Sequence, residues 1–586
     1  MAANTSNKFN FKLFKRLMQY TKKYPITFYS VLIAALFLSF FATARPYLLN
    51  EIITHELYNN DKQGLLLLIA ILTSVLVLEV VTQFLFIFYA NWLGQSIIKD
   101  IRVKLFKHML HFKMKYFDTN AVGKLVTNAV NDIEKIAEVF SQGFFVIIGD
   151  LLKMLVVIIV MLVTSVKLSL FVFAILPFIF IATRMFQKAM KAAFKDVRMQ
   201  VSSLNTFVQE HVTGMKIVQL FAREKEEYEK FKGINEKHKK AWIKTVWYNS
   251  IFFPIIELAS SITIAIILWN SGVDAVMNYD ISQIGVIAMF VQMTQMLFRP
   301  LRQLADKFNT LQMGMVAANR VFEVLDTNTS IEDNGTLEAN TINGIVEFKD
   351  VHFSYKEGEE VLKGISFKVN PGETVAIVGA TGAGKSTIIN LLSRFYEIDS
   401  GQILLDGVPI TQYKLENLRD KIAVVLQDVF LFSDSILNNI TLNNSLITQA
   451  EVEQAAKIIG VAEFIDKLPN TYAYNVKERG VMLSTGQRQL LAFLRAYVSN
   501  PEILILDEAT SSIDSYSEQL IQDATEKITK NRTSIVIAHR LATIKSADMI
   551  IVMDQGKIVE KGTHNDLLQI ENGYYKNLYE VQFVEV

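Results

Sequence analysis

Six long apolar stretches in the first half of the chain limit its possible folds more than any other feature. They cover residues 26–44, 65–90, 143–163, 168–182, 251–269 and 281–298. A helix needs about 20 mostly apolar residues to cross the hydrocarbon core of a bilayer. Any one of these stretches would also suit a buried helix of a large soluble protein. Six in series favour a domain with six membrane-spanning helices instead.

The composition agrees with such a domain and excludes several other classes of protein. A chain of 586 residues is too long for a single hydrophobic core, and 51% of its residues are hydrophobic. Cysteine is absent, which excludes disulfides, thiol catalysis and cysteine-ligated metal sites. The net charge of +1 argues against a nucleic-acid partner recognised through overall basicity.

The distribution of Lys and Arg orients the six stretches. Basic residues gather before the first stretch, between the second and third, and between the fourth and fifth, whereas the alternate connections carry few. The positive-inside rule therefore predicts that both termini lie in the cytoplasm. Residues 42–44 (ATA) resemble a signal-peptidase site, but the long polar leader and long apolar run fit an uncleaved first span better.

The two basic connections on the inner side are long and helical in pattern. We therefore expect the spanning helices to continue into the cytoplasm as paired hairpins. Residues 116–136 and 210–224 are candidates for the tips of these hairpins.

A polar segment without periodicity, residues 326–344, reads DTNTSIEDNGTLEANTING and predicts a linker. Beyond it, short apolar runs alternate with amphipathic stretches, which is typical of an α/β domain. We therefore expect a transmembrane domain over 1–326, a linker over 327–343 and a second domain over 344–586.

The second domain contains a phosphate-binding loop. The sequence VAIVGATGAGKSTIINLL is an apolar strand, a glycine-rich turn and a helix, and it matches G-x-x-x-x-G-K-[ST] at Gly379, Gly384, Lys385 and Ser386. Glycine at these points lets backbone N–H groups approach phosphate oxygens at a helix N-terminus. Lys385 is expected to neutralise β/γ-phosphate charge, and the Ser386 hydroxyl to ligate Mg²⁺.

An acidic pair follows a second apolar strand in EILILDEATSSID. Asp507 at the carboxyl end of this strand is expected beside the phosphate loop, where it holds magnesium through water, and Glu508 is expected to polarise the attacking water. Such a pair alone is a common surface feature, so this assignment depends on the phosphate loop.

The segments LSTGQRQ, ILILDEATSSID and SIVIAHR complete a family resemblance. They are similar in order and spacing to the nucleotide-binding domain of ATP-binding cassette (ABC) transporters. With six spans ahead of that domain, essentially the whole chain resembles a half-size exporter of the bacterial multidrug and lipid-flippase type. The resemblance implies an all-α six-helix transmembrane domain with long cytoplasmic extensions, followed by an α/β P-loop ATPase cassette.

The resemblance also implies roles for single residues. Tyr355 in VHFSYK is expected to stack on adenine, a contact that a core tyrosine would offer equally, and Gln427 to touch magnesium and sense movement of the transport domain. Asp514 matches the loop that crosses the seam between two cassettes. His539 matches the histidine that contacts the γ-phosphate.

The loop LSTGQ is expected to serve a second cassette. In this family two cassettes face head to tail, and Ser484, Gly486 and Gln487 of one close over the γ-phosphate held by the other. The family usually has glycine where this chain has Thr485. A Cβ restricts the backbone where N–H groups must approach phosphate, although the loop can tolerate it if Ser484 and Gly486 still reach.

The implied cofactors are ATP and Mg²⁺, and the implied site falls into three sets. The catalytic set is Lys385, Glu508 and His539, and the metal set is Ser386, Gln427 and Asp507. The nucleotide set is Tyr355, Gly379, Ala380, Thr381, Gly382, Ala383, Gly384, Lys385, Ser386, Thr387, Gln427, Ser484, Gly486, Gln487, Asp507 and Asp514.

The function that the resemblance implies is ATP-driven export, or flipping between leaflets, of amphipathic molecules such as drugs or lipids across the plasma membrane (the inner membrane of a bacterium). The partners would be a second half-transporter, in a homodimer or a heterodimer, and the bilayer, with no nucleic acid. An ATP-gated channel or regulatory membrane subunit would use the same parts. A DNA-repair ATPase is disfavoured by the six spans, and an importer by the fusion of permease and cassette.

Charged residues within the spans bear on the cargo. Glu79 and Glu257 lie inside expected spans, where a charge is costly and faces a cavity or a partner. They would either attract cationic compounds or pair with a neighbouring helix or a polar head group. Asp150 and Lys153 are three residues apart, which predicts that they pair with each other.

Overall fold

In a computed structural model, the chain forms two compact units. The structure describes residues 10–56, 61–277, 282–329, 331, 333–339, 342–507, 515–538 and 540–580. The first unit comprises Met1–Leu110 and Ala121–Asn328, and the second comprises His111–Asn120 and Thr329–Val586. The short segment His111–Asn120 therefore belongs to the second unit, although the chain on both sides of it belongs to the first.

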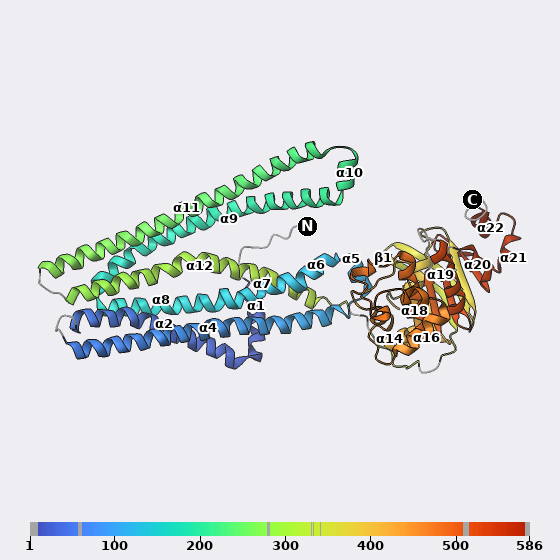
Figure 1. Cartoon of the computed structure of the whole chain (residues 1–586), viewed down its shortest axis with the longest axis horizontal. Coiled ribbons are helices and arrows are strands. Elements are labelled where there is room, and N and C mark those ends of the chain that lie inside the picture. Colours follow the sequence, from blue (N-terminus) through green and yellow to red (C-terminus); the bar gives the residue numbers. More distant parts are fainter. Residues whose placement is uncertain are drawn as a thin grey trace. The chain divides into compact units, whose positions relative to one another are not determined.

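The first unit is built of helices (Figure 1). They are α1 (Phe11–Gln19), α2 (Pro25–Glu51), α4 (Lys62–Met109), α6 (Val122–Thr127), α7 (Ile133–Glu138), α8 (Phe145–Thr164), α9 (Val166–Thr213), α10 (Met215–Leu220), α11 (Glu224–Met277) and α12 (Ser282–Asp326). Within the described residues, 6 helices are long and apolar enough to cross a membrane. The expected spans fall within these helices, except for residue 281, which lies outside the described residues.

The apolar side chains of these helices point outward as well as inward. None of the most apolar window of α4 is buried within the chain. Its side chains Leu66, Val80 and Phe84 are all more than 60% exposed. A surface this apolar is unfavourable in water and suits lipid, while the helix satisfies its own backbone hydrogen bonds. The six expected spanning helices are thus confirmed.

Two charged pairs of this unit involve residues that the sequence analysis placed inside the spans. Arg45 of α2 lies 3.8 Å from Glu79 of α4, so Glu79 has a partner on a neighbouring helix. Asp150 of α8 pairs with Lys307 of α12. The expected pairing of Asp150 with Lys153 is therefore wrong, because packing brings a cation on another helix closer than the one on its own. Glu257 is exposed on this chain.

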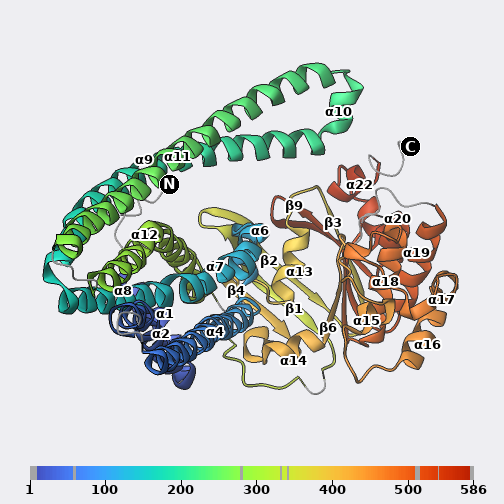
Figure 2. The same cartoon turned by 60° about the vertical axis from the view of Figure 1, so that its left-hand side comes forward.

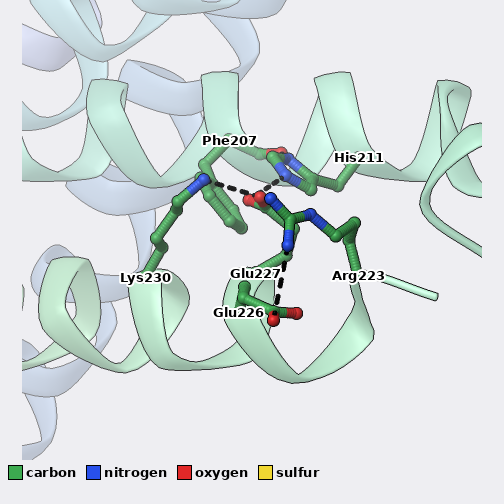
Figure 3. Close-up of polar contacts among 6 residues, drawn as sticks. All are labelled: Phe207, His211, Arg223, Glu226, Glu227 and Lys230. Atoms are coloured by element: carbon green, nitrogen blue, oxygen red, sulfur yellow. Dashed lines mark hydrogen bonds and ion pairs between the residues drawn. The ribbon is translucent and has the colours of Figure 1, made fainter. Parts of the chain in front are cut away.

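The hairpin of α9 and α11 closes through α10, as the two views show (Figures 1 and 2). Its tip falls within the expected segment 210–224. Nε2 of His211 lies 2.7 Å from a Glu227 oxygen, and Nδ1 lies 2.7 Å from the Phe207 carbonyl oxygen (Figure 3). Only an imidazolium donates to both acceptors at once. Lys230 donates to the other Glu227 oxygen at 2.6 Å, so Glu227 joins the two arms of the hairpin.

The other expected tip, 116–136, overlaps α5 (Met114–Thr119), which belongs to the second unit. Most of that segment instead continues as α6 and α7 of the first unit. The turn thus lies nearer the N-terminal end of the segment than the sequence pattern indicates.

The second unit has two sheets. The antiparallel sheet has the order β2-β1-β4-β5, and the six-stranded sheet has the order β10-β9-β3-β8-β7-β6. The strands are β1 (Val346–Lys356), β2 (Glu359–Val369), β3 (Thr374–Gly379), β4 (Ser400–Leu405), β5 (Val408–Pro409), β6 (Ile422–Val425), β7 (Ile503–Asp507), β8 (Thr533–Ile537), β9 (Met549–Asp554) and β10 (Lys557–Gly562). The expected α/β domain is confirmed.

The second unit also contains helices besides α5. They are α13 (Lys385–Leu392), α14 (Leu415–Asp420), α15 (Ile436–Thr441), α16 (Gln449–Ile459), α17 (Ala462–Asp466), α18 (Thr485–Val498), α19 (Ser515–Thr529), α20 (Leu541–Ser546), α21 (His564–Leu568) and α22 (Tyr574–Tyr579). Alternate residues of β7 enter different cores: Ile503 and Ile505 join one cluster, Leu504 and Leu506 the other. Burial on both faces explains why this strand is an uninterrupted apolar run.

The hairpin tip provides a first test. Glu227→Ala removes the acceptor shared by His211 and Lys230, so we expect the amides of 207–230 to exchange hydrogen several-fold faster than in the unchanged chain. Hydrogen exchange with mass spectrometry on the full chain measures this. Glu226→Ala is the matched control, since Glu226 only meets Arg223 at 3.5 Å between exposed side chains. Equal protection in both variants would show that Glu227 does not hold the tip.

Candidate nucleotide-binding site

The carboxyl ends of three parallel strands bring the phosphate loop and Asp507 to one edge of the sheet. Ile537 of β8 lies opposite Ile377 of β3 on one side and opposite Asp507 of β7 on the other. The loop leaving β3 and the carboxylate ending β7 therefore emerge level with each other. Ligands of open α/β sheets bind at this edge.

The loop itself needs glycine at its two ends. Gly379 has a φ of 152° and Gly384 a φ of 97°. A Cβ at Gly379 would lie 2.2 Å from the Met553 carbonyl oxygen, and one at Gly384 would lie 2.7 Å from a Leu362 methyl group. The loop thus combines backbone angles that favour glycine with close packing against β9 and β2.

The side chain of Lys385, the first residue of α13, folds back onto the loop. Its ammonium donates to the carbonyl oxygens of Gly379 at 2.7 Å and Ala380 at 3.0 Å. Burial lowers the pKa of Lys385 below its usual value, and the nearby Asp507 carboxylate opposes that shift. The Lys385 ammonium can exchange these bonds to carbonyl oxygens for stronger bonds to the phosphate oxygens of a nucleotide.

The residues expected to hold magnesium present oxygen ligands. The Ser386 hydroxyl donates to an Asp507 carboxylate oxygen at 3.4 Å. Hydroxyl and carboxylate oxygens are the ligands that Mg²⁺ prefers, so this pair fits the ion. Gln427 is exposed in the loop that follows β6, the strand beside β7.

Tyr355, near the end of β1, is half-buried beside the phosphate helix. Its hydroxyl donates to the Thr387 hydroxyl at 3.3 Å and accepts from the Asn390 amide at 3.0 Å. The ring lies edge-on to Phe353 and to Tyr396. Its place next to α13 suits the expected adenine contact, which remains a prediction.

The loop LSTGQ forms the start of α18. The Ser484 hydroxyl accepts from the Gln487 backbone N–H at 3.2 Å, and the Gln487 side chain accepts from the Ser484 N–H at 3.0 Å. The remaining N–H groups of a helix's first turn form a favourable place for an anion, so this helix start suits a phosphate group. Ser484 and Thr485 are exposed, whereas Gly486 is buried.

Thr485 occupies the first helical position of α18. Its φ is not among the positive values of the described residues, so its Cβ causes no backbone strain. Its hydroxyl accepts from the Arg488 side chain at 3.2 Å. The concern that a Cβ here distorts the loop therefore has no support in this structure.

Three expected site residues, Glu508, Asp514 and His539, lie outside the described residues. Their roles stay predictions. Tyr396 and Asp118, which the structure connects to Tyr355, were not among the expected site residues. Neither residue belongs to a recognised motif. The sequence offered only the aromatic residues next to them, in YFDT around Asp118 and RFYE around Tyr396.

Comparison with known proteins identifies both units. The family model described as "ABC transporter transmembrane region" matches residues 28–301, and the one described as "ABC transporter" matches residues 362–511. An uncharacterized ABC transporter ATP-binding protein of Bacillus subtilis, YknV, is 37% identical over 98% of this chain and 95% of its own length. This chain belongs to the ABC transporter family.

Two further ABC proteins specify the type of transporter. An ATP-dependent lipid A-core flippase of Haemophilus influenzae is 36% identical, over 97% of each chain. The structure of a bacterial Atm1-family ABC exporter with ATP bound has a TM-score of 0.74 and 26% identity, covering 95% of this chain and 98% of that one. The chain is accordingly a multi-pass ABC half-transporter of the exporter type, in which a fused ATPase domain binds nucleotide and couples its hydrolysis to transport.

The helical start at Thr485 leads to a second test. We expect the ATPase rate of Thr485→Gly to stay within about twofold of the unchanged ABC exporter, because the Cβ meets no strain and glycine at a helix start costs less than in a helix interior. Steady-state ATPase of the purified protein measures it. A gain well above twofold would show that the Cβ does hinder the loop. Thr485→Ser, which keeps the hydroxyl that Arg488 binds, is the control.

Proposed function

We propose that this ABC exporter moves amphipathic or lipophilic molecules, such as drugs or lipids, outward or between leaflets by alternating access. The observation that carries this proposal is the combination, in one chain, of six apolar helices and a phosphate loop level with Asp507. The flippase named among its relatives supports a lipid-like cargo.

The ATP chemistry rests on the residues at the sheet edge. Lys385 and the N–H groups of the loop Gly379, Ala380, Thr381, Gly382, Ala383 and Gly384 bind the phosphates, and Thr387 continues this turn. Bound Mg²⁺ would neutralise phosphate charge, held by Ser386, Asp507 and Gln427. Glu508 polarises the attacking water and His539 supports the γ-phosphate.

The orientation follows from the charge of the connections. Basic residues gather in the connections that lead to the hairpins, so the cassette and both termini are cytoplasmic and the protein lies in the inner, or plasma, membrane. We assign the transmembrane domain to 1–326, the linker to 327–343 and the cassette to 344–586.

The working form is a dimer. The capped start of α18, with Ser484, Gly486 and Gln487, is exposed at its tip and closes over the phosphates of a second cassette, with Asp514 at the seam. ATP thereby joins the cassettes, and hydrolysis lets them part. Since Thr485 adopts an ordinary helical angle, we propose a homodimer with two equivalent sites.

Hydrolysis and its coupling to cargo can be tested together. In the exporter reconstituted in lipid, we expect drugs, lipids or other amphipathic compounds to stimulate ATPase activity. Glu508→Gln should keep ATP binding and lose nearly all hydrolysis, because an amide does not polarise water as a carboxylate does. Lys385→Ala should instead weaken binding itself. Turnover near the normal rate in Glu508→Gln would contradict the role of Glu508, and an ATPase that no such compound stimulates would contradict the cargo.

The oligomeric form is tested by purifying the chain alone. We expect a stable dimer that hydrolyses ATP, with both sites trapped equally by vanadate, because both receive the same Thr485 loop. Light scattering and nucleotide counting measure the dimer and its sites. An exporter that hydrolyses ATP only after a second, different chain is added would show that the heterodimer is the working form.

A further inference from the structure

The short helix α5 is integrated into the same compact unit as the cassette. It lies in the connection between α4 and α6, both of which belong to the first unit, so α5 is covalently continuous with that unit on both sides. The Lys113 N–H donates to the Thr329 carbonyl oxygen at 2.7 Å. The Phe112 ring is buried and lies 4.4 Å from the Tyr116 ring, measured between centroids. These contacts anchor the segment of α5 within the cassette unit.

One side chain of α5 is hydrogen-bonded to the loop that follows α13. The Tyr396 hydroxyl donates to the Asp118 carboxylate of α5. Tyr396 stands in the loop after α13, the helix that starts the phosphate site. A hydrogen bond to an ionised acceptor is stronger than one between neutral groups, so this contact ties α5 to that loop.

Tyr396 in turn holds the ring of Tyr355. The two ring centroids are 5.0 Å apart with an interplanar angle of 88°, the edge-to-face arrangement that aromatic pairs prefer. Phe353 lies edge-on to both rings. On its other side Tyr355 is bonded to Thr387 and Asn390 of α13. The orientation of Tyr355 thus depends on α13 and on Tyr396 together.

A cavity lies beside the two tyrosines. Its volume is about 190 Å³, and its lining includes Lys113, Ser354, Tyr355 and Tyr396. Free space next to a ring lowers the cost of turning it, because no neighbour has to be displaced. Without the bond to Asp118, the ring of Tyr396 has room to leave Tyr355.

We propose that Tyr396 is a positioning residue through which α5 sets the affinity of the exporter for ATP. Held by Asp118, Tyr396 fixes the ring of Tyr355 in the orientation that stacks on adenine. This inference rests on the proposed adenine contact of Tyr355. Because coupling between two sites is reciprocal, nucleotide bound against Tyr355 also stabilises α5 in its place on the cassette.

The experiment measures binding of a fluorescent ATP analogue, with Mg²⁺, to the purified full-length chain. We expect Tyr396→Phe and Asp118→Ala each to weaken binding about three- to tenfold, the effect of losing one hydrogen bond. The kcat of ATP hydrolysis should stay within about twofold while KM rises, since neither residue touches the phosphates. The double variant should bind no more weakly than either single one, because both changes break the same bond.

The controls separate this role from a general loss of stability. Tyr413→Phe also removes a tyrosine hydroxyl bond, to the Leu405 carbonyl oxygen, in the same unit and should leave ATP affinity unchanged. Tyr396→Phe keeps the ring, so any packing role of Tyr396 survives in it.

Four outcomes would overturn the inference. Normal affinity in both Tyr396→Phe and Asp118→Ala is the first, and losses that multiply in the double variant are the second. The third uses Tyr355→Ala: weak binding there, with normal binding in Tyr396→Phe, rejects the relay and leaves the adenine contact standing. The fourth is normal binding in Tyr355→Ala, which rejects the adenine contact itself and the relay with it.

Discussion

The parallel pairing of β3, β8 and β7 is the constraint on which the ATP site depends. Ile537 is opposite both Ile377 and Asp507, so backbone hydrogen bonds hold the phosphate loop and the acidic residue at the same level. A slip of one residue in either pairing would turn each strand's side chains to the opposite face and separate Ser386 from Asp507. Burial of both faces of β7 in two hydrophobic clusters resists such a slip.

The same sheet positions the groups that are expected to bind nucleotide. The groups that meet nucleotide come from loops and helix starts: the turn after β3, the capped start of α18 and Tyr355 near the end of β1. Each is fixed by a contact of its own, namely the packing around Gly384, the reciprocal cap of Ser484 and Gln487, and the bonds of Tyr355 to α13. These contacts keep the protein groups near a binding geometry before ATP binds. Less conformational entropy is therefore lost on binding.

The fold and most of the site follow from the sequence because they depend on local patterns. Apolar length predicts each spanning helix, and the order strand, glycine-rich turn, helix predicts the phosphate loop. The sequence was a poorer guide to which side chains on different helices form pairs. Asp150 pairs with Lys307, far along the chain, instead of Lys153 on its own helix. Helical spacing indicates which side chains are neighbours on one helix but not which other helix packs against them.

The sequence alone therefore determined the two kinds of domain, the family and the residues of the phosphate loop, since these rest on composition and on motifs that are continuous in the chain. Only the tertiary structure decided three points. It assigned α5 to the cassette unit, linked Asp118 to Tyr396 and Tyr355, and gave Thr485 a helical angle free of strain. The physical reason is that these contacts join residues distant in sequence, or depend on backbone angles set by the packing around them. Neither long-range contacts nor such backbone angles produce a periodic or local pattern in the amino-acid sequence.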